Sequence, residues 1–305
     1  MKIRARLLIV AALAALAALA ALVAGCGSSS TAAPSDGLPR LQFDYDSSAP
    51  LGYVDRGRIN KRSYPVAVHD ISFRSGGRAV EGYLLVPHGS GRRPAVVFVH
   101  GSGGDRTELL GQAAELAQRN VVTLTLTEPS SSVTSSPSTL SGLLAQAKAL
   151  TVNDVVAVRR AVDLLQTLPT VDSKRIGYVG WSAGARLGAI VAAGEPRIRA
   201  LVLVSAGADP LSAFVAHAPP GSKGRVRTML GSVDPLRYIG LARSGSLRLE
   251  DGRKDEVVPR AALLNVVHAA PSGTSVKWYD ARHALNHQAY SDAFSWLAKK
   301  LPIDS

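Results

Sequence analysis

Short apolar runs alternate with longer amphipathic stretches from about residue 95 to residue 300, and this alternation constrains the fold more than any other feature. Ala95–Val99 contains no polar residue, which is typical of a strand covered on both faces. The other predicted strands are 121–126, 176–179, 201–204, 247–249 and 276–279. The predicted helices are 108–118, 143–165, 185–193, 260–269 and 285–300. Repeated strand–helix units predict an α/β fold with a mostly parallel sheet flanked by helices.

The region before this pattern, and two segments within it, differ from the strand–helix repeat. Upstream, Val66–Phe73 and Val80–Val86 are separated by a turn-rich break, which predicts an antiparallel hairpin. Within the pattern, 128–139 and 209–245 are crowded with Ser, Pro and Gly, and we expect both to be surface excursions. Such loops lie beside the carboxyl ends of parallel strands, so they are candidates for a substrate-facing rim.

The N-terminus has the pattern of an export signal. Lys2, Arg4 and Arg6 precede an unbroken apolar run, Leu7–Ala24, which ends in small residues. The run is also near the lower length limit for a permanent membrane helix. Cys26 favours the first interpretation, because Val-Ala-Gly-Cys resembles the bacterial lipobox, in which the Cys thiol receives diacylglycerol before cleavage. We therefore expect a lipoprotein signal peptide over 1–25, lipidation of Cys26, and an extracytoplasmic, membrane-anchored domain.

Composition sets the remaining boundaries. Residues 26–60 are rich in small and polar residues and predict a flexible tether, which leaves 61–305 as one α/β domain. The formal charge is +12, but the cations are scattered without interleaved aromatic residues, which argues against nucleic-acid binding. Cys26 is the only cysteine, so an intrachain disulfide, cysteine catalysis and a thiolate metal site are excluded.

Gly180-Trp181-Ser182-Ala183-Gly184 follows a predicted strand and precedes a predicted helix. A serine at such a sharp turn has strained backbone angles and needs small neighbours, which Gly180 and Gly184 provide. The turn projects the hydroxyl beyond the sheet, at the positive end of the following helix. Ser182 is thus a candidate nucleophile, and a plain glycine-rich turn is the alternative interpretation.

A second glycine-rich loop, His100–Gly104, follows the strand that ends at Val99. It lacks the Lys-Ser/Thr pair of a phosphate-binding loop, because it continues with Asp-Arg. Such a loop can turn a backbone N–H toward the nucleophile, and we expect the amides of Ser102 and Ala183 to form an oxyanion hole. We expect a structural role for His100, because its place in the chain argues against its being the catalytic base.

A serine hydroxyl needs a histidine to accept its proton and a carboxylate to orient that histidine. Asp255 follows a predicted strand and is the favoured carboxylate. His283 lies between the last predicted strand and the last helix, where a base belongs. The competing carboxylates are Glu250, Asp251 and Glu256, and the other histidines considered are His69, His88, His217, His268 and His287.

Taken together, these motifs resemble the α/β-hydrolase superfamily, most closely its dienelactone-hydrolase-like and related esterase or peptidase branches. The resemblance covers roughly residues 66–301 and rests on the order Ser182, Asp255, His283. It implies an eight-stranded, mostly parallel sheet with the three residues at its carboxyl edge.

The function that this resemblance implies is hydrolysis of carboxylic esters through an acyl-enzyme intermediate. Peptide or amide cleavage by the same groups, and an inert lipoprotein that only binds, stay open as alternatives. The expected partners are a small ester or acyl substrate and the membrane. Protein groups and water complete this chemistry, so no cofactor or metal is expected.

Overall fold

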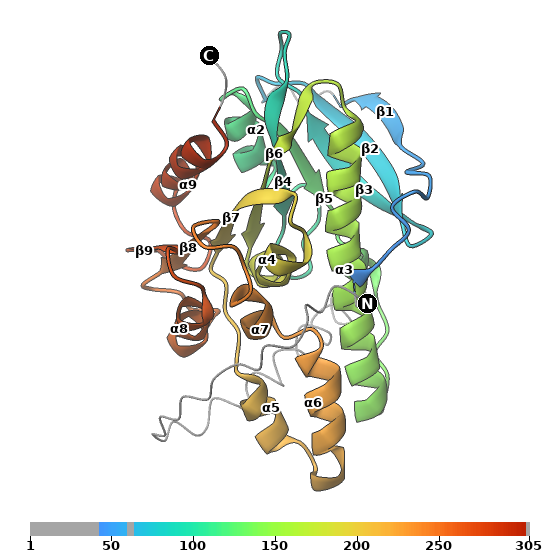
Figure 1. Cartoon of the computed structure of the whole chain (residues 1–305), viewed down its shortest axis with the longest axis vertical. Coiled ribbons are helices and arrows are strands. Elements are labelled where there is room, and N and C mark those ends of the chain that lie inside the picture. The colour runs from blue at the N-terminus through green and yellow to red at the C-terminus, as the bar shows by residue number, and fades with distance from the viewer. Residues whose placement is uncertain (1–42, 60–63, 303–305) are drawn as a thin grey trace.

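One large sheet organises the molecule (Figure 1). The computed structural model describes residues 43–59 and 64–302. Over these residues the sheet has nine strands in the order β1-β2-β3-β5-β4-β6-β7-β8-β9. The strands are β1 (Val54–Arg58), β2 (Val68–Ser75), β3 (Arg78–Leu85), β4 (Arg93–Val99), β5 (Val122–Leu126), β6 (Val171–Trp181), β7 (Ile198–Val204), β8 (Leu247–Gly252) and β9 (Ser275–Tyr279).

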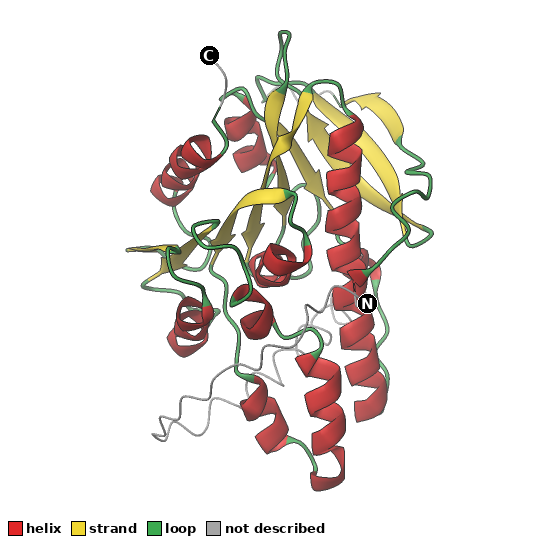
Figure 2. Ribbon diagram, viewed as in Figure 1, coloured by secondary structure: helices red, strands yellow, loops and turns green. Residues whose placement is uncertain are grey.

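Helices cover both faces of the sheet (Figure 2). They are α2 (Leu110–Ala117), α3 (Leu140–Thr167), α4 (Ala183–Gly194), α5 (Leu211–His217), α6 (Lys223–Gly231), α7 (Pro235–Ile239), α8 (Arg260–Ala269) and α9 (His287–Lys300), with short 3₁₀ turns at Pro129–Ser132 and Pro220–Ser222. The alternation of strands and helices is the one that the sequence predicts.

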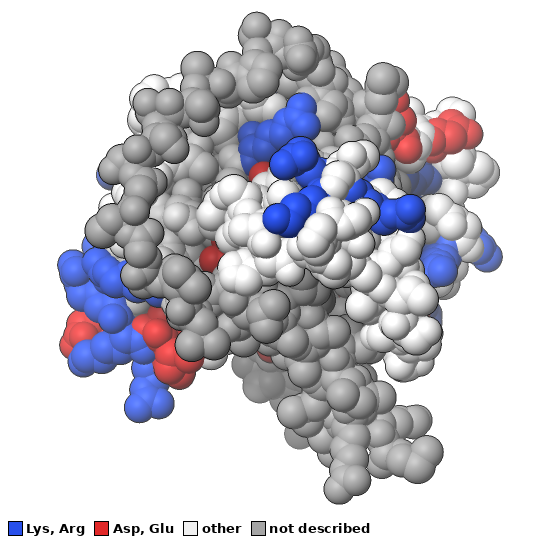
Figure 3. Space-filling view, turned by 90° about the horizontal axis from the view of Figure 1, so that it is seen from below, with Lys and Arg blue, Asp and Glu red and all other residues white. Residues whose placement is uncertain are grey.

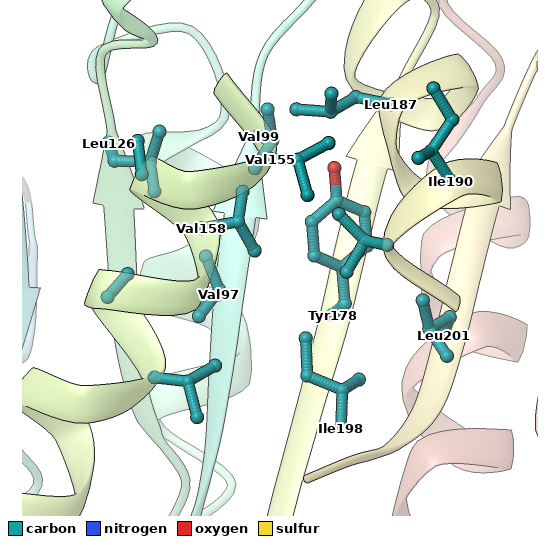
Figure 4. Close-up of a cluster of buried hydrophobic side chains, with 14 of the residues drawn as sticks. Val97, Val99, Leu126, Val155, Val158, Tyr178, Leu187, Ile190, Ile198 and Leu201 are labelled. Atoms are coloured by element: carbon teal, nitrogen blue, oxygen red, sulfur yellow. The ribbon is translucent and has the colours of Figure 1, made fainter. Parts of the chain in front are cut away.

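The core consists of two apolar layers, one on each face of the sheet. Val97 and Val99 of β4 point to one face and pack with residues of α3 and α4, including Val155 and Ile190 (Figure 4). Residues of α2 and α9 fill the layer on the other face. Because successive side chains of a strand point to opposite faces, an unbroken apolar strand supplies both layers at once.

Strand direction places one edge of the sheet apart from the rest. Strands β5, β4, β6, β7, β8 and β9 pair in parallel, whereas β1, β2 and β3 pair antiparallel. The loops that follow the parallel strands therefore meet at a single carboxyl edge. In Figure 1 this edge points down, toward α5 and α6.

The structure corrects two expectations about the N-terminal side of the domain. The sheet has nine strands and not eight, and the tether ends before residue 60. Val54–Arg58, which we expected to be part of a flexible tether over 26–60, forms β1, the ninth strand, and pairs with β2. Phe43 is 1% exposed and packs edge to face with Tyr238, at a ring-centroid distance of 5.3 Å. Tyr45 also donates a hydrogen bond to Asp163, and Arg160 donates one to Ala49 O, so several contacts join this polar stretch to the domain.

The segment 209–245 is helical and partly buried, which corrects its interpretation as a surface excursion. Asp234 caps α7 by accepting a hydrogen bond from the amide of Leu236, and Pro235 occupies the first turn. Tyr238 and Ile239 of that helix are 1% and 0% exposed. Proline and glycine suggested loops, but proline is also favoured at the first position of a helix.

None of the helices in residues 43–59 and 64–302 combines the length and the apolar character needed to cross a bilayer. The signal peptide predicted over 1–25, Cys26 and the rest of the tether up to residue 42 lie outside the described residues.

Candidate active site

Ser182 lies at the turn between β6 and α4 and has a strained backbone. Its φ and ψ are 55° and −112°, a conformation that residues other than glycine rarely adopt. Hydrogen bonds hold the turn on both sides: the amide of Ser182 donates to Val204 O, and the amide of Gly184 donates to His100 O. Such strain persists only where the surrounding structure enforces it, and it is concentrated at functional sites.

The two glycines of the motif are required by space. A Cβ at Gly180 would lie 2.5 Å from the carbonyl oxygen of Gly184, and a Cβ at Gly184 would lie 2.3 Å from that of Val99. No flexible side chain could move aside, because the obstructing atoms belong to the backbone. The turn can therefore close on itself at Gly180, and pack against the end of β4 at Gly184, only if both positions lack a side chain.

Ser182, His283 and Asp255 form a continuous chain of hydrogen bonds. The Oγ of Ser182 lies 2.9 Å from Nε2 of His283, and Nδ1 of the same ring lies 2.8 Å from Oδ2 of Asp255. Since a carboxylate only accepts, Nδ1 carries the proton, and Nε2 is left to accept from the hydroxyl. Ser182 and Asp255 are 101 and 28 positions before His283 in the chain, and the three side chains meet at the carboxyl edge of the sheet.

The loops that bear Asp255 and His283 are joined to each other. The amides of Arg253 and Lys254 donate to Tyr279 O and Ala281 O, at 2.8 Å and 3.0 Å. The other carboxylate oxygen of Asp255 accepts the amides of Val257 and Val258, both at 2.9 Å. This carboxylate is therefore fixed by its own loop before it meets the imidazole.

The three carboxylates that competed with Asp255 in the sequence have other surroundings. Glu250 accepts hydrogen bonds from Arg248 and Tyr279. Glu256 accepts the backbone amide of His283 at 3.4 Å and does not contact its ring. Asp251 is 1% exposed, and its Oδ2 has no partner among the described residues.

His100 braces the loop after β4 and does not reach Ser182. Its Nδ1 donates to Gly101 O at 2.7 Å, and its Nε2 accepts the amide of Glu128 at 3.3 Å. These two partners require the neutral imidazole, and burial lowers the pKa of His100 accordingly. The carboxylate of Glu108 holds the same loop through the amide of Gly101.

The two amides expected to form an oxyanion hole lie at the turns that flank Ser182. In the described part of the chain, neither Ser102 N nor Ala183 N donates a hydrogen bond to a protein group. Both donors are therefore free to bind a substrate oxygen.

Trp181, Ser205 and Tyr178 support the site and were not identified from the sequence. The indole of Trp181 and the hydroxyl of Ser205 both donate to His283 O, at 3.0 Å and 2.9 Å. The hydroxyl of Tyr178 donates to Gly184 O at 2.6 Å. The only available signal was position: each of them lies in or directly after a strand that ends at this edge.

The remaining candidates lie away from this edge or on the surface. His287 is 81% exposed and faces Glu115. A hollow of about 440 Å³ lies at the opposite, amino edge of the sheet and is lined by Lys174, Arg199, Arg243 and Lys300. Among the described residues, no group of three or more His, Cys, Asp and Glu side chains is arranged to hold a metal ion.

A mostly parallel sheet with a serine at a strand–helix turn, followed in sequence by a carboxylate and a histidine, defines an α/β-hydrolase. A family model described as acetyl xylan esterase (AXE1) matches residues 54–206. The chain therefore belongs to the acetyl xylan esterase family, and its class is that of the carboxylic ester hydrolases. The resemblance to the dienelactone-hydrolase-like branch stays a prediction.

Solved structures with the same fold include esterases and a peptidase. Acetyl xylan esterase 1 from Thermoanaerobacterium sp. JW/SL YS485 is 16% identical, with a TM-score of 0.70 over 86% of this chain and 92% of that one. Acetyl xylan esterase from Paenibacillus sp. R4 is 17% identical, with a TM-score of 0.68 over 86% and 92%. A puromycin-hydrolyzing peptidase of Mycobacterium tuberculosis is 17% identical, with a TM-score of 0.61 over 81% and 41%. A search of curated proteins found no match.

Asp251→Asn should make the protein more stable at alkaline pH. Burial, then the charges of Asp255 and Glu250, raise the pKa of Asp251 to about 7. The folded state therefore binds this proton more tightly than the unfolded chain does, and the free energy of unfolding falls as pH rises from about 4 to about 7. Asparagine avoids that loss, so urea unfolding at pH 8 should show a gain on the order of 2–4 kcal/mol and a small difference at pH 4.

Asp280→Asn is the matched control, because Asp280 is 71% exposed and pairs with Lys254 at the surface. Its unfolding should follow the wild-type pH dependence. Equal stability of wild type and Asp251→Asn across this pH range would contradict a buried, protonated Asp251.

Proposed function

We propose that the chain hydrolyses carboxylic esters, acetyl esters among them, through an acyl-enzyme formed on Ser182. The observation that supports this most strongly is the hydrogen-bond chain from Ser182 through His283 to Asp255. Family membership supports ester substrates and an acetyl acyl group.

Each residue of the chain of hydrogen bonds has a defined task in this proposal. The Oγ of Ser182 attacks the carbonyl carbon while Nε2 of His283 takes its proton, and Asp255 holds the imidazolium in place. The amides of Ser102 and Ala183 donate to the oxyanion of the tetrahedral intermediate. The positive N-terminal end of the α4 dipole adds to this stabilisation. The same Nε2–H then protonates the departing alcohol. Water next attacks the acyl-enzyme while Nε2 takes its proton, and return of that proton to Ser182 Oγ releases the acid.

We also propose that the chain is an extracytoplasmic lipoprotein anchored through Cys26. The basic residues Lys2, Arg4 and Arg6, the apolar run Leu7–Ala24 and the small residues before the cysteine support this. Cleavage before Cys26 removes three positive charges from the formal +12 and leaves +9, which would add a weak attraction to anionic lipid headgroups.

A fluorophosphonate should label the wild-type protein, and Ser182→Ala should abolish both labelling and hydrolysis of 4-nitrophenyl acetate. The reason is that this reagent reacts with an activated serine hydroxyl, and alanine removes it. Mass spectrometry of the labelled peptide is the measurement. Ser295→Ala, which removes a hydroxyl of the exposed face of α9, is the control and should label normally.

Two results would overturn the proposal in different ways. Labelling that persists in Ser182→Ala would mean that another residue is the nucleophile. Failure of the wild-type protein to label or to hydrolyse any acyl ester would favour a lipoprotein that only binds. Faster cleavage of anilides than of the matched esters would favour the peptidase or amidase alternative.

Asp255→Asn should keep the fold and reduce kcat by about 10⁴, the loss measured for the equivalent change in another serine triad. The Oδ1 of asparagine can still accept the amides of Val257 and Val258. Its NH₂ group would donate to Nδ1 of His283 and leave the proton on Nε2, where it prevents acceptance from Ser182. Steady-state kinetics and circular dichroism test this, with Asp280→Asn as control; near-normal kcat in Asp255→Asn would contradict the assignment.

Cys26→Ala should abolish incorporation of fatty acid, because the acylated thiol is lost, and should leave the signal peptide attached, because lipidation precedes cleavage. Metabolic labelling with an alkyne analogue of palmitate in expressing bacteria measures the first effect, and the mass of the purified protein measures the second. Ser30→Ala, four residues on, is the control. Unchanged lipid labelling of Cys26→Ala would refute the lipobox interpretation.

A further inference from the structure

Arg186 is a charged residue beside the nucleophile that the proposed reaction does not use. It lies one helical turn after Ser182 on α4, and its amide donates to Ser182 O at 2.9 Å. Its side chain is exposed. The guanidinium makes no hydrogen bond or ion pair with any residue that the structure describes.

Two carboxyl groups lie near Arg186 without pairing with it. Glu128 follows β5 and Asp209 follows β7, and both interact with the guanidinium electrostatically from beyond ion-pair distance. Burial, then the charge of Asp154, raises the pKa of Glu128 well above its usual range, and burial also raises the pKa of Asp209. Both shifts reduce the negative charge available to neutralise Arg186. A guanidinium still keeps its charge in proteins.

The side of the molecule beyond the carboxyl edge is also positively charged. Residues 209–239, which run from the loop after β7 to the end of α7, contain four Lys and Arg residues against two Asp residues and no Glu. Lys223, Arg225 and Arg227 are exposed on α6. Figure 3 views the molecule from this side and shows a group of Lys and Arg side chains near its centre, with Asp and Glu mainly toward the periphery. Such a field raises the local concentration of anions.

We infer that Arg186 forms an anion-binding subsite beside Ser182, and that the esters this protein hydrolyses best carry a carboxylate several bonds from the scissile bond. The inference rests on the proposed function and specifies its substrate class. A guanidinium offers two parallel N–H donors to a carboxylate, which gives both charge and orientation. The carboxylate could belong to the acyl or to the alcohol part of the ester, and the structure supplies the same recognition for either.

The subsite is tested with esters that differ in charge and little in shape. 4-Acetoxybenzoate and 4-acetoxybenzamide place the difference in the alcohol part, and mono-4-nitrophenyl glutarate and 4-nitrophenyl pentanoate place it in the acyl part. The wild-type ratio of kcat/KM for the anionic ester to kcat/KM for its neutral partner should exceed one in at least one pair. Arg186→Gln should lower that ratio about tenfold or more, and Arg186→Lys should restore part of it.

Arg199→Gln is the matched control. Arg199 is exposed at the amino edge of the sheet, so this change removes one positive charge far from Ser182. Its ratio should equal that of the wild type.

Binding is measured separately, so that failure of hydrolysis and failure of the subsite can be distinguished. In calorimetry, Ser182→Ala protein should bind 4-acetoxybenzoate more tightly than 4-acetoxybenzamide, and adding Arg186→Gln should remove the difference. If the wild type hydrolyses no ester, the proposed function fails and this measurement alone decides the subsite.

Equal ratios in wild type and Arg186→Gln, or equal binding of acid and amide, would overturn the inference. The same holds if Arg186→Gln slows both esters of each pair equally and lowers the stability of the fold. That result would mean that Arg186 only balances the charge of Glu128.

Discussion

The positive φ of Ser182 is the constraint on which the rest of the site depends. In this conformation the hydroxyl lies 2.9 Å from Nε2 of His283 at the carboxyl edge of the sheet. The geometry is maintained because Gly180 lets the turn close tightly and Gly184 lets it pack against the backbone of β4. Amide hydrogen bonds also fix the turn to β7 and to the loop after β4. Local strain is thus offset by packing against the most buried part of the sheet.

Carboxyl groups with raised pKa values surround the site and divide into separate roles. Asp255 is held by two amides and by an imidazole, so its negative charge has partners. Asp251 and Glu250, a few residues before it, are buried, and their pKa values are both raised to about 7. When two carboxyl groups lie close together in a buried region, ionisation of one raises the free energy needed to ionise the other. Protonation of Asp251 near neutral pH therefore removes a like charge from beside Asp255.

Sequence periodicity predicted the sheet and its helices because each buried strand must be apolar on both faces, and that requirement is visible in Ala95–Val99. The convergence of Ser182, His283 and Asp255 was predictable because parallel strands bring their carboxyl ends together. The role of Phe43 was not, since one aromatic residue in a polar stretch has no period. Helix α7 was missed because its two buried residues occupy too short a segment to show amphipathic spacing. The free guanidinium of Arg186 depends on distances to Glu128 and Asp209, which no local pattern encodes.

The segment 209–245 joins β7 to β8, while the three residues of the hydrogen-bond chain lie outside it. Its ends are fixed by the sheet, but its first two helices extend away from it (Figure 1). Recombination or gradual drift could therefore replace α5 and α6 in related chains while the reacting atoms keep their positions. Ligand preference would then change between related chains without any change in the residues that carry out the reaction.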